Sequence, residues 1–145
     1  MTAAPDMGLT TATIRLVNGI DSGRARVGEL EEAKIRSVTV ESMVDTGAYL
    51  LCINENIRNQ IGVPTIRRHE AEFADGSLRL VDIVGPIEVT FENRGTTCEA
   101  MVMPGDSQVL LGAIPLEGMD VCVDPKRQRL IVNPLNPYVA RHVVK

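Results

Sequence analysis

The chain has 145 residues, a length that fits one domain with a single modest core. Its 15 Lys and Arg and 19 Asp and Glu give a net charge of −4, which argues against binding to nucleic acid or acidic membranes, because both need clustered positive charge. Two Phe, two Tyr and no Trp argue against a stacking platform for single-stranded nucleic acid. Hydrophobic residues make up 44% of the chain, which excludes a disordered polypeptide.

The cysteines and histidines indicate neither a metal nor a disulfide scaffold. Cys52, Cys98 and Cys122 are scattered and form no C-x-x-C pair. His69 and His142 lack metal-ligand spacing, and no P-loop or G-x-G-x-x-G motif suggests a cofactor. The first residues have no secretory pattern and no apolar run approaches a membrane span, so we expect a cytoplasmic protein without a membrane partner.

Short strands dominate the first third of the chain. Residues 1–8 are expected to be a loose tail, and residues 11–17 alternate between apolar and polar as a half-buried strand does. Asn18-Gly19 is then predicted to begin a turn. A second strand is expected over residues 35–40, followed by the apolar pair Met43-Val44.

At most two short helices are expected in the rest of the chain. Asn54 as an N-cap and Gly62 as a terminator predict one helix over residues 54–61, and Pro115 suits the first turn of another. Further strands are expected at residues 87–91, 97–103, 109–112, 119–123 and 130–132.

Asp75-Gly76 predicts a β-hairpin over residues 68–84. Asp-Gly favours a two-residue type I′ turn, because both central positions of that turn need a positive φ. The predicted register pairs Phe73 with Leu78, Ala71 with Leu80, and Glu72 with Arg79.

Asp45-Thr46-Gly47-Ala48 is the tetrapeptide that suggests chemistry. The apolar Met43-Val44 precedes an acidic residue, a hydroxyl residue and a glycine, a pattern that suits a carboxylate at the tip of a tight loop. Thr46 can lock such a loop by hydrogen bonding, and Gly47 offers an unhindered N–H to the carboxylate. Alone, Asp-Thr-Gly also fits an ordinary turn.

The order of motifs resembles the retroviral-like (retropepsin-type) aspartic proteases, most closely their bacterial single-domain branch. Asp45–Ala48 is followed by an Ala74-Asp75-Gly76 hairpin tip and then by Leu110-Leu111-Gly112. The similarity covers roughly residues 9–135 and continues through Leu116-Glu117 and Val123-Asp124-Pro125.

The resemblance implies a mainly β protein with a closed barrel, one or two short helices and a flap hairpin. It also implies an aspartic endopeptidase without metal or cofactor, acting on an extended peptide or protein as a homodimer with one catalytic Asp45 per chain. The flap would comprise Ala74, Asp75, Gly76 and Ser77, and Leu110, Leu111 and Gly112 would support the active loop. Residues 136–145 would be a C-terminal tail that contributes to the dimer interface.

Two alternatives remain open at this point. The chain could keep the fold as a non-catalytic dimer that binds peptides, or Asp45-Thr46-Gly47 could be only a turn in an unrelated domain. Asp21-Ser22-Gly23 is formally a second aspartic-protease tripeptide, but Arg24 follows it where a small residue is expected. We therefore predict that this second tripeptide is a turn.

Overall fold

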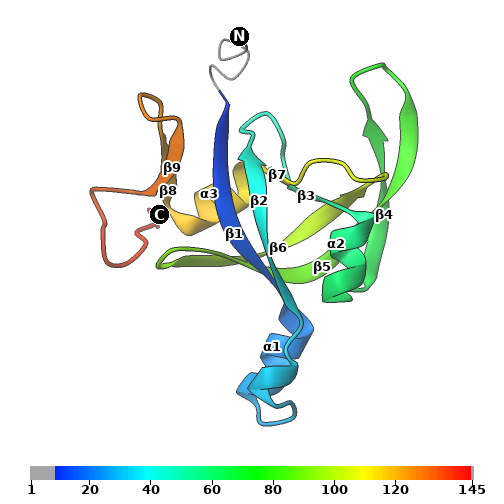
Figure 1. Ribbon diagram of the computed structural model, residues 1–145, viewed down its shortest axis with the longest axis horizontal. Coiled ribbons are helices and arrows are strands. Elements are labelled where there is room, and N and C mark those ends of the chain that lie inside the picture. The colour runs from blue at the N-terminus through cyan, green and yellow to red at the C-terminus, as the bar shows by residue number, and fades with distance from the viewer. Residues whose placement is uncertain (1–8, 145) are drawn as a thin grey trace.

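The computed structural model describes residues 9–144, which are mainly β with one mixed sheet (Figure 1). The loose tail expected at residues 1–8 lies outside the described residues. The elements in chain order are β1 (Thr10–Asn18), α1 (Gly19–Arg26), the 3₁₀ turn η2 (Glu32–Lys34), β2 (Ser37–Val44), β3 (Leu51–Asn54), α2 (Glu55–Ile61), β4 (Thr65–Glu72), β5 (Leu78–Phe91), β6 (Arg94–Met103), β7 (Leu110–Leu111), α3 (Ala113–Met119), β8 (Val121–Asp124) and β9 (Arg129–Val132).

The nine strands follow the order β4-β5-β6-β3-β7-β2-β1-β9-β8, and β1 also pairs with β5. Hydrogen-bonded neighbours therefore form a ring of six strands through β5, β6, β3, β7, β2 and β1. The strand β4 and the β8–β9 hairpin lie outside this ring (Figure 1). The prediction of a mainly β protein is confirmed.

The core lies inside this arrangement and is built largely from aliphatic side chains. In β1, buried residues alternate with exposed ones from Thr10 to Arg15, as the sequence pattern predicted. Ile14 and Leu16 of β1 are almost wholly buried, as are Ile53 of β3 and Leu111 of β7. The short strand β7 therefore belongs to the core and not to a surface loop.

The helices differ from expectation at the start of the chain. The side chain of Asn18 accepts hydrogen bonds from the backbone N of Ile20 and of Asp21, which caps α1. The turns predicted at Asn18-Gly19 and at Asp21-Ser22-Gly23 are therefore wrong, and so is the limit of two helices, because three α-helices are present. In α1, the buried Asp21 carboxylate binds the Arg36 guanidinium at 2.8 Å.

The helix α2 matches its prediction. The Asn54 side chain accepts a hydrogen bond from Ile57 N at 2.9 Å, as an N-cap residue does. Gly62 ends the helix with φ +66°, a left-handed conformation that glycine adopts without steric cost. The helix α3 also forms where Pro115 predicted it, with Pro115 in its first turn.

The predicted hairpin exists, but its turn differs. Gly76 N donates to Phe73 O at 2.8 Å, and Phe73 N donates to Ser77 O at 2.9 Å. Of the two turn residues predicted to need a positive φ, only Gly76 has one, at +84°. The connection is therefore a longer loop across residues 73–77, not a two-residue type I′ turn.

This longer loop shifts the hairpin register by one residue. Glu72 lies opposite Leu78, and Ala71 lies opposite Arg79. Arg79 consequently shares a face with Phe73, and its guanidinium carbon lies 5.1 Å from the ring centroid. The predicted pairs Phe73–Leu78, Ala71–Leu80 and Glu72–Arg79 are therefore wrong, because a slip of one residue exchanges the two faces of a strand.

The C-terminal segment, residues 133–144, is tied to the body without forming a helix or strand. Asp120 accepts hydrogen bonds from the side chains of Asn133 (2.9 Å) and Asn136 (3.0 Å) and from Arg141 N (3.0 Å). These bonds lower the pKa of Asp120 to about 2, the Asn133 side chain contributing most. No helix among residues 9–144 has the length and apolar character needed to cross a membrane.

Candidate active site

Asp45 lies directly after β2, at the start of a tight loop. Its backbone N donates to Leu111 O at 3.0 Å, and its carbonyl accepts from Ala48 N at 3.1 Å. Gly47 N donates to the carboxylate Oδ1 at 2.9 Å, the contact predicted for this glycine. Thr46 is exposed, and its hydroxyl has no hydrogen-bond partner among residues 9–144. The loop therefore orients one carboxylate oxygen through its own backbone.

The strand β7 lies between the two strands that flank this loop. Leu110 and Leu111 pair in parallel with Met43 and Val44 of β2, and Leu110 also pairs antiparallel with Cys52 of β3. The chain thus enters the loop on one side of β7 and leaves it on the other. Residues that are 65 positions apart in the sequence, Asp45 and Leu110, are brought to the same place, as the motif order suggested.

Gly112 packs directly against the loop. A Cβ atom at this position would lie 2.3 Å from Leu50 O and 2.7 Å from Ala48 O, so only glycine fits. The next two residues, at the start of α3, donate to the same stretch: Ala113 N to Ala48 O at 2.9 Å, and Ile114 N to Tyr49 O at 3.1 Å. The backbone after Asp45 is therefore held on one side by β7 and on the other by α3.

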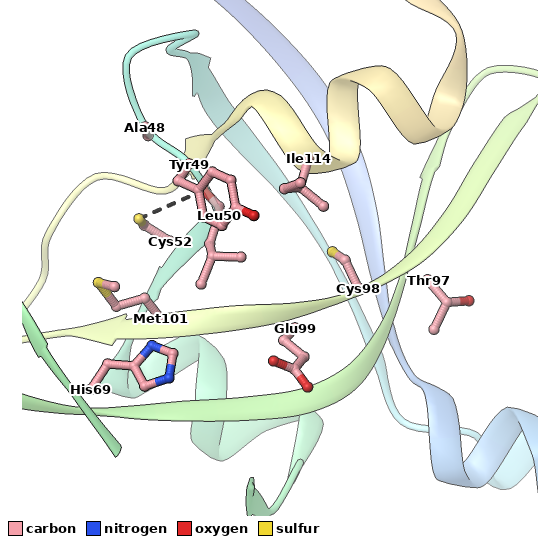
Figure 2. A pocket seen from close by; sticks show the side chains of 10 residues that line it. All are labelled: Ala48, Tyr49, Leu50, Cys52, His69, Thr97, Cys98, Glu99, Met101 and Ile114. Carbon is pink, nitrogen blue, oxygen red and sulfur yellow. Dashed lines mark hydrogen bonds between the residues drawn. The ribbon is translucent and has the colours of Figure 1, made fainter. Parts of the chain in front are cut away.

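An apolar pocket of about 520 Å³ opens beside the loop (Figure 2). Leu50 and Ile114 lie on one side of it in this view, and His69 and Glu99 lie on the other. His69 comes from β4, so the base of the hairpin forms part of the wall. The full lining is Ala48, Tyr49, Leu50, Cys52, His69, Thr97, Cys98, Glu99, Met101 and Ile114.

Among these lining residues, the sequence motifs identified Ala48 as part of the active loop, and Ile114 was expected to pack beneath that loop. Tyr49 and Leu50 could have been inferred, since they follow the active loop directly. The pocket walls that come from β4, β6 and α3 could not be predicted, because they depend on strand register and on where α3 packs. Neither can be read from neighbouring residues in the sequence.

The two thiols of the pocket have raised pKa values. Burial, with a smaller contribution from the Asp45 charge, raises the pKa of Cys52 to about 11. Burial likewise raises the pKa of Cys98 to about 12, with Glu99 nearby. Both thiols are therefore protonated at neutral pH, and the reactive form of cysteine is the thiolate. Within residues 9–144, no group of three or more His, Cys, Asp or Glu side chains could hold a metal ion.

The hairpin tip carries the predicted flap residues, Ala74 to Ser77. Asp75 Oδ1 accepts hydrogen bonds from Ser77 N (2.9 Å) and from Ser77 Oγ (2.6 Å). The Ser77 hydroxyl is the main reason that the pKa of Asp75 is lowered. The Asp75 side chain therefore orders the turn through Ser77. The hairpin rises toward the same side of the molecule as the Asp45 loop (Figure 1, green).

No known family model matches the chain, and no curated protein matches it. The functional interpretation therefore depends on the geometry of the Asp45 loop, on the elements that hold it, and on the pocket next to it.

Proposed function

We propose that the protein is a retropepsin-like aspartic endopeptidase that acts as a homodimer, with Asp45 as the catalytic residue of each chain. The observation that supports this most is the Asp45 loop itself. Its carboxylate is oriented by Gly47 N, and its backbone is held by Leu111 on one side. Gly112 packs directly against the backbone of Ala48 and Leu50. A carboxylate held in one orientation suits catalysis, because the rate depends on how well the catalytic group is positioned against the substrate.

A second copy is needed because the chain supplies one such loop. Hydrolysis by aspartic proteases uses two carboxylates, and two-fold symmetry would bring two Asp45 side chains together on the axis. Carboxylates about 3 Å apart cannot both ionise, so the pair holds one proton; aspartic proteases are the standard example of this effect. The roles of base and acid then belong to the pair and not to either chain.

The reaction follows from this shared proton. The ionised carboxylate accepts a proton from a water molecule, and the water oxygen attacks the carbonyl carbon of the peptide. The protonated carboxylate donates its proton to the carbonyl oxygen, which gives a neutral tetrahedral diol. Collapse of the diol breaks the C–N bond. The carboxyl that took the water proton donates it to the leaving nitrogen, and one diol hydroxyl gives its proton to the other carboxylate, so the pair again holds one proton.

The rest of the fold supports this proposal. The six-strand ring of pairings is compatible with the closed barrel that the resemblance implies. The hairpin tip across residues 73–77 can fold over a bound peptide and exclude water, and extended peptides commonly bind by adding a strand to exposed backbone.

Cleavage of a diverse peptide library between about pH 3 and pH 8 tests the proposal, with Asp45→Asn beside the wild type. The amide of asparagine can still accept the Gly47 hydrogen bond but cannot ionise, so the variant should fold and fail to cleave. Sedimentation should show twice the 15.8 kDa chain mass for both proteins. A wild-type dimer that cleaves no peptide would overturn the proposal, and so would equal cleavage by the variant.

A non-catalytic peptide-binding dimer is the second candidate. It is favoured by the apolar pocket, which can bind a side chain whether or not Asp45 has a catalytic partner. Peptide binding by both the wild type and Asp45→Asn, with cleavage by neither, would decide for this candidate.

A further inference from the structure

We propose that the outer edge of β4, the edge that faces away from β5, binds the same edge of a second copy of the chain. The two hairpins would then form one antiparallel sheet around a two-fold axis at His69. This contact is separate from the proposed pairing of two Asp45 loops, and it does not depend on catalysis. It adds a second surface through which copies of this chain associate.

The outer edge of β4 is open along the whole strand. The strand lies at one end of the sheet order, and its only strand partner within residues 9–144 is β5. Every residue of β4 except Ala71 is exposed. The hairpin that carries this edge projects at one side of the molecule (Figure 1, green). A long strand with an unpaired edge is a template on which another strand can pair.

The hydrogen bonds of the hairpin show which backbone groups point toward the outer edge. Phe73 N donates to Ser77 O at 2.9 Å, so the N–H of Phe73 points across the hairpin. Backbone groups alternate in direction along a strand, and the pairing of β4 with β5 shows no shift of register beyond the start of β4. The N–H and C=O groups of Arg68, Glu70 and Glu72 therefore point toward the outer edge and are the ones that a second strand would bond.

Charged side chains commonly protect an open edge, but those of β4 are complementary to a second copy in one register. An axis at His69 places Arg68 opposite the second copy's Glu70, and Glu70 opposite the second copy's Arg68. In this register no two arginines and no two glutamates face each other. An axis at residue 67, 68, 70 or 71 would instead place like charges opposite, which is destabilising. Those like pairs are Arg67 with Arg67, Arg68 with Arg68, Glu70 with Glu70, and Glu70 with Glu72.

The complementary charges lie on the face of the hairpin that is turned away from the pocket. His69 lines the pocket (Figure 2), and the side chains of its neighbours in the strand point to the opposite face. On that face Arg68 Nε contacts Asp82 Oδ1 at 3.1 Å, while the Arg68 side chain remains 68% exposed. The second copy's Glu70 would extend this row, so that Arg68 lies between two carboxylates.

The contact is small and therefore weak. Stable interfaces bury about 1,600 Å² in total, and two paired strand edges with exposed ion pairs bury less. We expect a dissociation constant of roughly 0.1–1 mM. Electrostatic complementarity of this kind mainly fixes which surfaces meet and in which register.

Sedimentation equilibrium of the full chain at about 10 μM and about 1 mM tests the contact, because these concentrations bracket the expected dissociation constant. The apparent mass of the wild type should rise about 1.5-fold between them. Glu70→Arg and Arg68→Glu should each abolish the rise, because each places like charges opposite at the axis. An equal mixture of the two variants should regain it, because every Arg then faces a Glu.

Glu72→Arg is the matched control for Glu70→Arg. It makes the same change of charge on the same face of β4, but in this register residue 72 lies opposite Ile66, so the rise in mass should persist. A wild type whose mass stays constant would overturn the inference. So would a Glu70→Arg protein that associates like the wild type, or a mixture that fails to regain the rise.

A cysteine at the axis gives a second test. Two residues at position 69 would form a pair without hydrogen bonds, with Cα atoms about 4.5 Å apart, which lies within disulfide range. In a Cys122→Ser background, which removes the partly exposed native thiol, His69→Cys should form linked dimers in oxidised glutathione. Ala71→Cys should not, because residue 71 lies opposite Arg67. Equal cross-linking by both variants would overturn the register.

These outcomes separate the two proposals. A dimer that cleaves peptides but gains no mass at the higher concentration would overturn the β4 contact and keep the protease. A wild type that cleaves nothing, while the charge variants associate only when mixed, would overturn the protease and keep the β4 contact.

Discussion

Replacing Gly112 with alanine would measure how tightly the candidate site is built. The new Cβ would lie 2.3 Å from Leu50 O and 2.7 Å from Ala48 O, well inside the 3.0 Å at which real contacts stop. Both oxygens belong to the backbone, and Ala48 O also accepts a hydrogen bond from Ala113 N. Overpacking costs about 1–3 kcal/mol, and each hydrogen bond lost adds about 1 kcal/mol. We therefore expect the free energy of unfolding to fall by about 2–5 kcal/mol.

Urea unfolding followed by circular dichroism measures this difference. Gly23→Ala is the matched control, because a Cβ at Gly23 has no atom within 4 Å and the position lies inside α1. That substitution should stabilise the protein by about 0.5–1 kcal/mol. Gly112→Ala should also lose cleavage, because the displaced loop is the one that holds Asp45. Equal stability of the two alanine variants would refute the reasoning.

Three further predictions concern the rest of the chain. Asp120→Ala should speed proteolysis of the C-terminal segment. The Asn133 side chain is the main group that lowers the pKa of Asp120 to about 2. In the wild type this anchoring is therefore complete above the unfolded pKa and is lost as the pH falls through about 2. Hydrogen-exchange protection factors of the C-terminal segment that stay constant as the pH falls through this range would contradict the prediction. Asp21→Ala should lower the free energy of unfolding by about 1–3 kcal/mol at neutral pH. The Arg36 side chain lowers the pKa of Asp21, so the wild type loses this stabilisation in acid, and urea unfolding should show a smaller difference between the two proteins there. A thiol reagent at mildly alkaline pH should modify Cys122 first and the two buried cysteines only after unfolding. Rapid modification of all three cysteines in the folded protein would contradict the burial described above.

The successful predictions were those that depend on neighbours along the chain. Asn54 and Gly62 bound α2 because capping and left-handed termination involve residues within one helical turn. The alternation in β1 predicted its buried face for a similar reason. Asp45 was singled out because an apolar strand, an acid and a glycine were consecutive in the sequence.

The wrong predictions arose where the same short sequence is compatible with more than one local backbone conformation. Asp-Gly suits a two-residue turn and also a longer loop with one left-handed glycine, and the structure has the second. Asn18 suits a turn and also a helix cap, and it caps α1. The pocket could not be predicted from the sequence, because Leu50, Met101 and Ile114 meet only through the pairing of β3 with β6 and the docking of α3.

The insertion of β7 between β2 and β3 also constrains when the site can exist. Ribosomes deliver the N-terminal part of a chain first, so Asp45 emerges well before Leu110 and Leu111. Until those two residues arrive, the loop lacks the Leu111 carbonyl that binds Asp45 N and the glycine against which Leu50 packs. A nascent or truncated chain that ends before residue 112 therefore carries the aspartate without its scaffold. The order of synthesis thus delays any activity of Asp45 until most of the polypeptide has been made.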